Sequence, residues 1–574
     1  MAKIEFFKED LTIEVEEGTL LLDAIRQAGL DIETPCNGMG FCGKCKVIAK
    51  GALSKAEGRE LKSIDTIRNE RLSCVATVEG DVLVELIEKE KVLQTVSKGY
   101  SIEVPLDSQV KRVKLREIQR KSPEPYGSST GYTLRTVELL QKLTEFEENH
   151  FKNIWGVVAG DELLDVANYE KNILGLAVDI GTTGVSYYLV DLETGGIVGS
   201  LSSLNPQTRF GGDVLTRISY CMEHPEGAEE MKKLIVDEIN RSMDRIVGDH
   251  YQTDEIFQIV ISANTTMMHL FLGVNPTALA KSPYRSIFLS VEPMKAFRAG
   301  LNVNPAAILD IMPSASSYVG GDITSGLLAS GFLENSRAAF IDIGTNGELA
   351  AIVDGQVICT STAAGPALEG MNIECGCRAE PGAIEKFDID EDFKVTYQTI
   401  ENRKATGICG SGLIDIVGAL VRRGLLDKGG RWSRKIDPRV AERLKDKKFY
   451  ITEEIYISQK DIRQVQLAKG AIAAGLILML EEIGATMEDI PEVYIAGAFG
   501  YHIDPDNIRT IGLIPGKYKG EIKFLGNTSL EGARLSLINR GIREDARRVR
   551  ESMEVVELSL RDNFQKVFLK ELNF

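Results

Sequence analysis

Alternating apolar and polar positions open the chain. The stretches "KIEFF" (3–7) and "LTIEVEEG" (11–18) alternate as strands do. Between residues 19 and 30, "TLLLDAIRQAGL" instead spaces its apolar residues as a helix does and ends at Gly29. A later alternating stretch, "GDVLVELI" (80–87), supplies a further strand. The pattern predicts a small α+β domain within residues 1–95.

A second pattern, an apolar strand followed by a glycine turn and another apolar strand, occurs twice. It is seen in "ILGLAVDIGTTGVSYYLVDLETG" (173–195) and again in "AAFIDIGTNGELAAIVDG" (338–355). Asp179 and Asp342 occupy the same place in the two copies. A repeat of this length predicts a duplicated α/β fold, which we place at residues 171–574.

The chain between these two parts has a weaker pattern. "SPEPYGSSTG" (122–131) is rich in turn residues, and "YTLRTVELLQKLTEF" (132–146) has helical spacing. We therefore expect a linker at 96–131 and a small middle region at 132–170.

Composition and charge exclude some partners. A chain of 574 residues with 43% hydrophobic and 26% charged residues is typical of a soluble multidomain protein. The net charge of −17 argues against nucleic acid as a partner. The N-terminus has no apolar signal segment, and the longest apolar run, "AIAAGLILML" (471–480), is too short to span a bilayer. We expect a cytoplasmic protein with no membrane partner.

The stretch "TPCNGMGFCGKC" (34–45) fits three motifs: a dinucleotide-binding GxGxxG, a P-loop lacking its final Ser or Thr, and a cysteine-ligand loop. Both nucleotide motifs need a following helix, whereas "KCKVIAKGALS" (44–54) reads as a short strand. A fourth cysteine follows at position 74. The spacing favours a [2Fe–2S] cluster over a zinc site or unliganded thiols. The predicted ligands are Cys36, Cys42, Cys45 and Cys74. With the strand–strand–helix order before them, they indicate a β-grasp ferredoxin.

The two glycine turns of the repeat have their own chemistry. Backbone N–H groups and hydroxyls in such turns can bind phosphate oxygens, and the preceding Asp can hold Mg²⁺ through water. Facing copies would clamp a nucleotide from both sides. The candidate residues are Gly181, Thr182 and Thr183 in the motif at 179–184, Gly344, Thr345 and Asn346 in the motif at 342–347, and the carboxylates Asp179 and Asp342.

These turns resemble the phosphate motifs of the actin, sugar-kinase and Hsp70-like (ASKHA) ATPases, whose domain is a duplicated RNase H-like fold. "EVYIAGAFG" (492–500) resembles their adenosine motif, which implies that Gly497 lets the backbone approach the nucleoside. The stretches 261–273 and 407–420 resemble the connecting helices. The resemblance implies ATP and Mg²⁺ as cofactors.

Other candidate ligands form no second site. Cys375, Cys377 and Cys409 do not match a known cluster spacing, so we expect them to be buried and unreactive. The five histidines are scattered, and the chain has no corrinoid-binding DxHxxG stretch. Any corrinoid therefore belongs to a partner.

The whole chain resembles the ATP-dependent reductive activators of corrinoid proteins, through 317–331 ("SYVGGDITSGLLASG") and 362–385 ("TAAGPALEGMNIECGCRAEPGAIE") as well as the motifs above. The resemblance implies one-electron reduction of a partner's cobalt(II) to cobalt(I), an anaerobic methyl-transfer system, a low-potential electron donor and a homodimer. Glu369 and Glu348 are candidates for the base in ATP hydrolysis. A ferredoxin-fused small-molecule kinase and a redox-sensing nucleotide-binding regulator are the alternatives.

Overall fold

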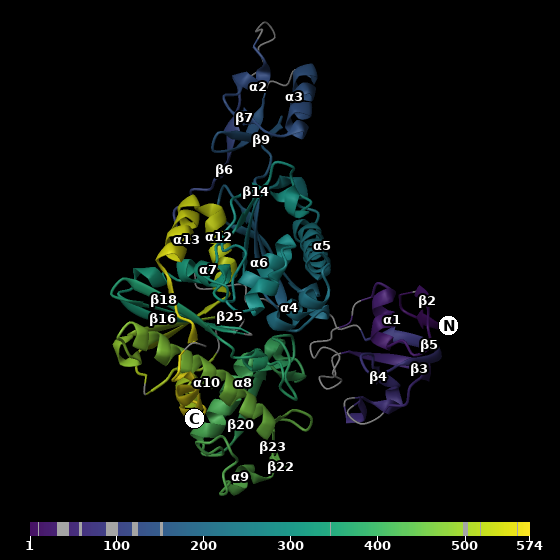
Figure 1. Cartoon of the computed structure of the whole chain (residues 1–574), viewed down its shortest axis with the longest axis vertical. Helices are drawn as coiled ribbons and strands as arrows, with labels where there is room; N and C mark the ends of the chain where they lie inside the picture. The colour runs from purple at the N-terminus through teal and green to yellow at the C-terminus, as the bar shows by residue number, and fades with distance from the viewer. Residues whose placement is uncertain are drawn as a thin grey trace.

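The structure is a computed structural model of the whole chain (Figure 1). It describes residues 1–9, 11–30, 32, 45–56, 60–62, 64–87, 102–116, 124–149, 153–344, 346–497, 503–516, 518–558 and 561–574.

The N-terminal domain is a five-stranded mixed sheet with one helix packed on it. The strand order is β2-β1-β5-β3-β4, in which β1 and β5 are parallel and the other neighbours antiparallel. Leu21, Ala24 and Ile25 recur on one face of the helix and join the sheet residues in a single core. This is the predicted β-grasp arrangement. The elements are β1 (Ala2–Phe6), β2 (Leu11–Val15), α1 (Leu21–Gln27), β3 (Lys46–Leu53), η1 (Glu60–Lys62), η2 (Thr66–Arg68), β4 (Glu70–Leu72) and β5 (Val78–Leu86).

The small middle domain is a four-stranded sheet of order β6-β8-β9-β7 with α3 packed on it. Its elements are β6 (Val110–Lys114), α2 (Tyr126–Ser129), β7 (Thr133–Leu134), α3 (Val137–Asn149), β8 (Trp155–Ala159) and β9 (Glu162–Ala167). The edge strand β6 falls within the stretch 96–131 that we expected to be a linker. Before β6, the Asp107 amide donates to the Ile538 carbonyl at 2.8 Å. Part of the expected linker is therefore folded, as a strand of the small middle domain and as a segment hydrogen-bonded to the end of the helix that contains Ile538.

The rest of the chain forms two lobes with the same sheet topology, which confirms the duplication. In each sheet three antiparallel strands are accompanied by two strands that run parallel to the first, and only a short sixth strand at the edge differs between the lobes. Lobe I has the order β12-β11-β10-β13-β15-β14 and lobe II the order β26-β25-β16-β17-β18-β27. The strands of lobe I are β10 (Leu174–Ile180), β11 (Gly184–Asp191), β12 (Ile197–Leu204), β13 (Ile256–Ala263), β14 (Met294–Lys295) and β15 (Ile308–Ile311). Those of lobe II are β16 (Arg337–Ile343), β17 (Gly347–Val353), β18 (Gln356–Thr362), β25 (Glu492–Gly497), β26 (Glu521–Gly526) and β27 (Glu554–Val555).

Two helices, α7 (Gly321–Ala329) and α12 (Thr528–Ile538), connect the lobes. The expectation that the stretches 261–273 and 407–420 supply the connecting helices is wrong, because these stretches form α6 (Thr265–Leu272) and α8 (Gly410–Arg422). A single apolar core contains residues of both helices together with Val260 of one sheet and Phe340 of the other. The helices cross closely, because a Cβ at Gly532 would overlap the carbonyl oxygen of Ser325. Their N-terminal ends carry polar residues to the same place between the lobes.

Most of the remaining helices cover the outer faces of the sheets, whereas α13 (Arg540–Ser552) packs beside α7 and α12 (Figure 1). In lobe I they are η3 (Pro206–Arg209), α4 (Val214–Glu223), α5 (Gly227–Val247), η4 (Thr253–Glu255), α6 (Thr265–Leu272), η5 (Pro276–Ala280), η6 (Ala296–Ala299) and η7 (Phe332–Glu334). In lobe II they are η8 (Pro366–Glu369), η9 (Ile400–Asn402), α8 (Gly410–Arg422), α9 (Pro438–Ala441), α10 (Gln459–Glu482), η10 (Met487–Asp489), α11 (Pro505–Ile511), α13 (Arg540–Ser552) and α14 (Phe564–Lys570). Lobe II also holds two small sheets, of β19 (Ala383–Ile389), β20 (Val395–Thr399) and β21 (Gly407–Ile408), and of β22 (Leu444–Lys445), β23 (Lys448–Tyr450) and β24 (Tyr456–Ser458).

Helix α10 contains the apolar run seen in the sequence. By length and composition it could cross a membrane, but 78% of its most apolar stretch is buried inside the protein. Its residues Ile462, Val465 and Ile472 belong to the core of lobe II. This burial is typical of the central helix of a folded domain.

Candidate functional site

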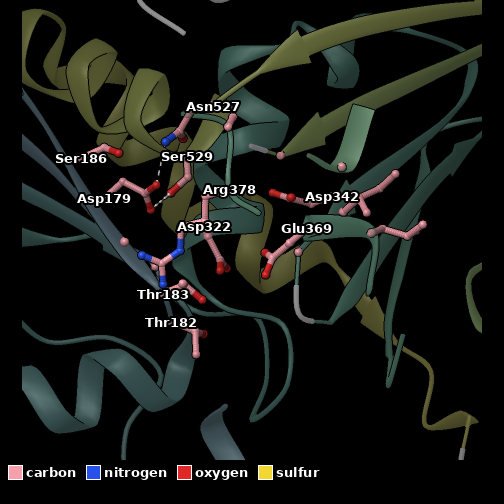
Figure 2. Close-up of a pocket in the computed structure, with 18 of the residues that line it drawn as sticks. Asp179, Thr182, Thr183, Ser186, Asp322, Asp342, Glu369, Arg378, Asn527 and Ser529 are labelled. Carbon is pink, nitrogen blue, oxygen red and sulfur yellow. Dashed lines mark hydrogen bonds between the residues drawn. The ribbon is translucent and has the colours of Figure 1, made fainter. Parts of the chain in front are cut away.

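A cavity of about 290 Å³ lies between the lobes and is lined by both glycine turns (Figure 2). The carboxyl ends of β10 and β16 point into it, because the duplicated sheets face each other across α7 and α12. Of the predicted nucleotide-site residues, the structure brings together Asp179, Gly181, Thr182, Thr183, Asp342, Gly344, Asn346, Glu369 and Gly497 in its wall. Thr345 lies outside the described residues. The candidate Glu348 also lines the cavity.

Asp179 is held in place by two side chains from α12. Asn527 Nδ2 donates to its Oδ2 at 2.8 Å, and Ser529 Oγ donates to its Oδ1 at 2.7 Å (Figure 2). Burial raises the pKa of Asp179, while these two hydrogen bonds act to lower it. The carboxylate is thus fixed in orientation at the end of β10 by Asn527 and Ser529, which lie near the C-terminal end of the sequence.

In the second copy the environment of the carboxylate is different. Asp342 is paired across the strands with Glu348, whereas the residue paired with Asp179 is Ser186. Burial, together with the charges of Asp322, Asp179 and Glu369, raises the pKa of Asp342 to about 8. Burial, together with the charges of Asp322, Asp342 and Glu369, raises the pKa of Glu348 well above its usual value. The lobe II side of the cavity therefore gathers carboxyl groups, and their burial and mutual repulsion favour the protonated forms of Asp342 and Glu348.

Asp322 is a functional candidate that the sequence analysis did not single out, although its stretch 317–331 was noted. It lies at the start of α7, and a Cβ at the preceding Gly320 would overlap Cα of Asn264. Burial, and then the charge of Asp179, raises the pKa of Asp322 to about 7. A pKa close to neutrality is the property expected of a proton acceptor or donor.

Arg378 is the second residue that the sequence analysis missed. It is the only Lys or Arg among the described residues that line the cavity, and Figure 2 shows its side chain in the cavity on the side of Thr183. It follows Cys377 in lobe II and lies in the stretch 362–385, which resembles a family signature. A guanidinium facing the phosphate turn of lobe I can bind an anionic ligand that touches both lobes.

The two turns differ in the polar groups that they offer. In the first, Asn264 Nδ2 donates to the Thr182 hydroxyl at 3.2 Å, which fixes that side chain beside the cavity. In the second, the Gly344 amide donates to the carbonyl of Asn346 at 3.0 Å and is engaged within its own turn. The first turn therefore offers the cavity a hydroxyl that is fixed in position, whereas the amide of Gly344 in the second turn is already hydrogen-bonded.

Gly497 has a steric reason to be glycine. Its φ of +120° is unfavourable for other residues, and a Cβ would overlap the Ile343 carbonyl oxygen and lie 3.2 Å from Asp342 Oδ1. The residue thus allows β25 to pack tightly beside the second turn. Its predicted approach to the nucleoside stays a prediction.

Two of the four predicted cluster ligands lie in the described part of the N-terminal domain. Cys45 and Cys74 are buried, and their sulfur atoms are 3.1 Å apart. A hydrogen bond with Cys74 lowers the pKa of Cys45 to about 6 against the effect of burial. Two adjacent thiols, of which Cys45 ionises readily, fit a thiolate-bound iron–sulfur cluster. Cys36 and Cys42 lie outside the described residues.

Of the three cysteines expected to be buried, Cys377 and Cys409 are buried, whereas Cys375 is half-buried. Burial raises the pKa of both Cys375 and Cys409. Cys377 is buried in a small apolar cluster with Cys409. Cys409 also lines the inter-lobe cavity at the start of α8.

The oxygen-rich wall of the cavity is compatible with Mg²⁺ bound together with phosphates. Among the residues that the structure describes, no group of three or more His, Cys, Asp or Glu side chains forms a ready metal site. Mg²⁺ usually keeps several waters and binds through one or two carboxylates plus substrate phosphates. Asp179 and Asp342 would serve in this way.

Three family models match successive parts of the chain. A 2Fe-2S iron-sulfur cluster binding domain matches residues 6–79, the middle region of RACo matches residues 174–335, and the C-terminal domain of RACo, the ASKHA domain, matches residues 337–574. The region that this family describes as its middle part coincides with lobe I, and its ASKHA part with lobe II.

Curated relatives match over most of the chain. The corrinoid activation enzyme RamQ of Eubacterium limosum is 32% identical over 561 residues, which cover 92% of this chain and 91% of the relative. The [Co(II) methylated amine-specific corrinoid protein] reductase of Methanosarcina barkeri is 25% identical over 70% of this chain and 77% of its own.

A solved structure has the same overall architecture. The reductive activator for corrinoid,iron-sulfur protein superposes with a TM-score of 0.75 at 31% identity, over 100% of this chain and 98% of that one. The similarity extends across the N-terminal domain, the small middle domain and both lobes.

Proposed function

The chain belongs to the RACo family of reductive activators of corrinoid proteins, and we propose that it couples ATP hydrolysis in the inter-lobe cavity to one-electron reduction of a corrinoid protein's cobalt(II) to cobalt(I). One observation supports this proposal most strongly. The N-terminal domain holds two adjacent cysteines of the kind that bind a cluster, and the same chain places two phosphate-type turns around one cavity between the lobes. Similarity over the whole chain favours this function over a ferredoxin-fused kinase or a redox-sensing regulator.

The need for ATP follows from the redox potentials. The cluster, when bound by Cys36, Cys42, Cys45 and Cys74, supplies a single electron at a potential of about −400 mV. Formation of cobalt(I) requires a lower potential, and each 59 mV of deficit costs about a factor of ten for one electron. The free energy of ATP hydrolysis can offset such a deficit.

The residues of the cavity have separate tasks in this scheme. The first turn and Arg378 bind and orient the phosphates, and Asp179, held by Asn527 and Ser529, would hold Mg²⁺ through water beside them. Asp322, Asp342, Glu348 and Glu369 surround the same space. Of these, Asp322 is our candidate for accepting the proton of the attacking water, because its pKa of about 7 suits a base at neutral pH.

The two lobes provide the mechanical part of the coupling. A nucleotide that contacts both turns favours one angle between the lobes, and α7 and α12 connect them. This change in angle assists reduction only if the corrinoid partner binds the two conformations of the protein with different free energies. Binding of the partner in the favoured state then raises the effective potential of its cobalt.

The reaction also needs a metal cofactor, an electron donor and a partner protein. We infer Mg²⁺ as the cofactor of ATP hydrolysis, a low-potential protein or reductant as electron donor, a homodimer as the working unit and the cytoplasm as its location. The acidic character of the chain, with a net charge of −17, supports a protein partner over nucleic acid.

The test is whether reduction depends on nucleotide. Purified chain, excess reductant and a cobalt(II) corrinoid protein should give cobalt(I) only when Mg·ATP is added. Equal cobalt(I) formation without ATP would contradict the coupling.

A further inference from the structure

The ferredoxin domain contacts lobe I through one of its own arginines. Arg26, at the end of α1, donates from Nη2 to the main-chain oxygen of Arg209 at 2.9 Å. Arg209 is the last residue of η3, the short helix that precedes α4. In Figure 1 the N-terminal domain lies beside the α4 end of lobe I.

The residue that begins η3 also supports the first phosphate turn. Asn205 is fully buried and caps η3 by accepting a hydrogen bond from the Gln207 amide. Its Nδ2 donates to the Gly181 carbonyl at 2.8 Å, and its own amide donates to the Thr183 carbonyl at 3.0 Å. One residue therefore joins η3 to both ends of the turn.

A buried arginine makes the third connection. Arg217 of α4 is fully buried, and its guanidinium donates to the carbonyl oxygens of Thr182 and, at 2.9 Å, of Gly211. It also donates to the Gln207 side chain at 3.3 Å. No carboxylate forms an ion pair with it in the described part of the chain, so its charge is compensated by carbonyl and amide oxygens and by the Met267 sulfur, to which Nη1 donates at 3.1 Å. The cation lies directly behind the turn that faces the cavity.

We propose that the surface formed by η3 and the start of α4 is the docking surface of the chain's own ferredoxin domain, and that Asn205 and Arg217 couple this docking to phosphate bound at the turn 181–184. Hydrogen bonds connect every step, from Arg26 through Arg209 and η3 to the three carbonyls of Gly181, Thr182 and Thr183. The proposal rests on the proposed function in taking this turn as phosphate-binding.

Coupling of this kind is reciprocal. If nucleotide changes the stability of the docked state, docking must change the affinity for nucleotide by the same factor. A ferredoxin domain under such control would leave or return to lobe I according to the nucleotide state. ATP would then set when the electron carrier is available to the corrinoid partner.

The test uses Arg26→Ala in the full-length, cluster-containing protein. The matched control is Arg68→Ala, which removes an exposed arginine of the same domain that pairs with Asp65 at 3.6 Å. Hydrogen exchange of residues 206–223 reports docking, and calorimetry with a non-hydrolysable ATP analogue and Mg²⁺ reports nucleotide affinity.

We expect Arg26→Ala to speed exchange in 206–223 and to change the analogue's Kd by about fivefold or more, while Arg26→Lys and Arg68→Ala stay near wild type. Wild-type exchange and wild-type Kd in Arg26→Ala would overturn the coupling while leaving the proposed function intact. If the wild-type protein binds no nucleotide at all, the proposed function fails first and the coupling with it.

Discussion

Asn527 donates a hydrogen bond of 2.8 Å to Asp179, although the two residues are 348 positions apart in the chain. The bond joins the start of α12 to the end of β10, and Ser529 adds a second one at 2.7 Å. In the proposed function Asp179 would hold Mg²⁺ through water, and these two bonds fix the orientation of its carboxylate from the helix that connects the lobes.

Removal of the Ser529 hydroxyl should change the pH dependence of ATP hydrolysis. This hydrogen bond lowers the pKa of Asp179, so Ser529→Ala raises that pKa and the carboxylate becomes protonated at higher pH. We expect the acidic limb of the kcat profile to move up by about one to two pH units. Ser536→Ala, on the same helix but bonded to Gly532, is the control and should leave the limb in place. An unmoved limb in a folded Ser529→Ala protein would contradict this role.

Neutralisation of Asp342 should stabilise the nucleotide-free protein at high pH. Its pKa is raised from 3.8 to about 8, so the folded state retains a proton that the unfolded chain releases, and wild-type stability falls as pH rises through this window. Asp342→Asn should therefore raise the melting temperature at pH 9 but not at pH 4. The control Asp437→Asn removes an exposed carboxyl whose pKa Arg439 lowers to about 2, and should give no gain. A pH-independent gain for Asp342→Asn would show that its charge is not the cause.

Arg378 should matter most for nucleotide affinity. Loss of a charged hydrogen-bond donor costs about 1.5–3 kcal/mol, so Arg378→Ala should raise the Kd for Mg·ATP about 10- to 100-fold. Arg378→Lys should recover part of this, because lysine keeps the charge but not the planar fork. Arg403→Ala removes an exposed arginine paired with Glu401 and is the control. Calorimetry that found Kd unchanged in Arg378→Ala would remove this residue from the site.

The cluster cysteines should separate electron transfer from ATP hydrolysis. Cys74→Ala should abolish the visible absorption of the anaerobic protein and its reductase activity, while ATP hydrolysis continues. Cys221→Ala, a buried cysteine in lobe I, should keep both properties. A cluster spectrum that survives Cys74→Ala would exclude this residue as a ligand.

Contiguous motifs were predictable from the sequence, and residues supplied by distant segments were not. Asp179 and Asp342 each belong to a repeated strand and turn, so local pattern placed both, and the structure brings both to one cavity. Asp322 and Arg378 lie in the stretches 317–331 and 362–385, which resemble family signatures, but nothing in either stretch marks them as cavity residues. They reach the cavity through packing of α7 and of the loop after η8. The order of residues within one short stretch does not indicate how that stretch packs against distant parts of the chain.

The middle of the chain shows a different limit. Strand β6 lies at the edge of its sheet with Val110 as its buried residue, and its lysines and arginine make it look like a solvated segment. Edge strands commonly carry such charges, which prevent pairing with other chains. The charged residues therefore favoured a linker over a strand in the sequence analysis, because the alternation of apolar and polar residues in β6 is weak.

The most direct measurement is anaerobic spectroscopy of a cobalt(II) corrinoid protein mixed with this chain and excess reductant. Three arms receive Mg·ATP, a non-hydrolysable analogue or no nucleotide, and a fourth uses the double variant Asp179→Ala/Asp342→Ala with Mg·ATP. We predict the cobalt(I) spectrum in the wild-type ATP arm alone. Equal cobalt(I) formation with no nucleotide, or with the double variant, would contradict ATP-driven reduction at the inter-lobe cavity.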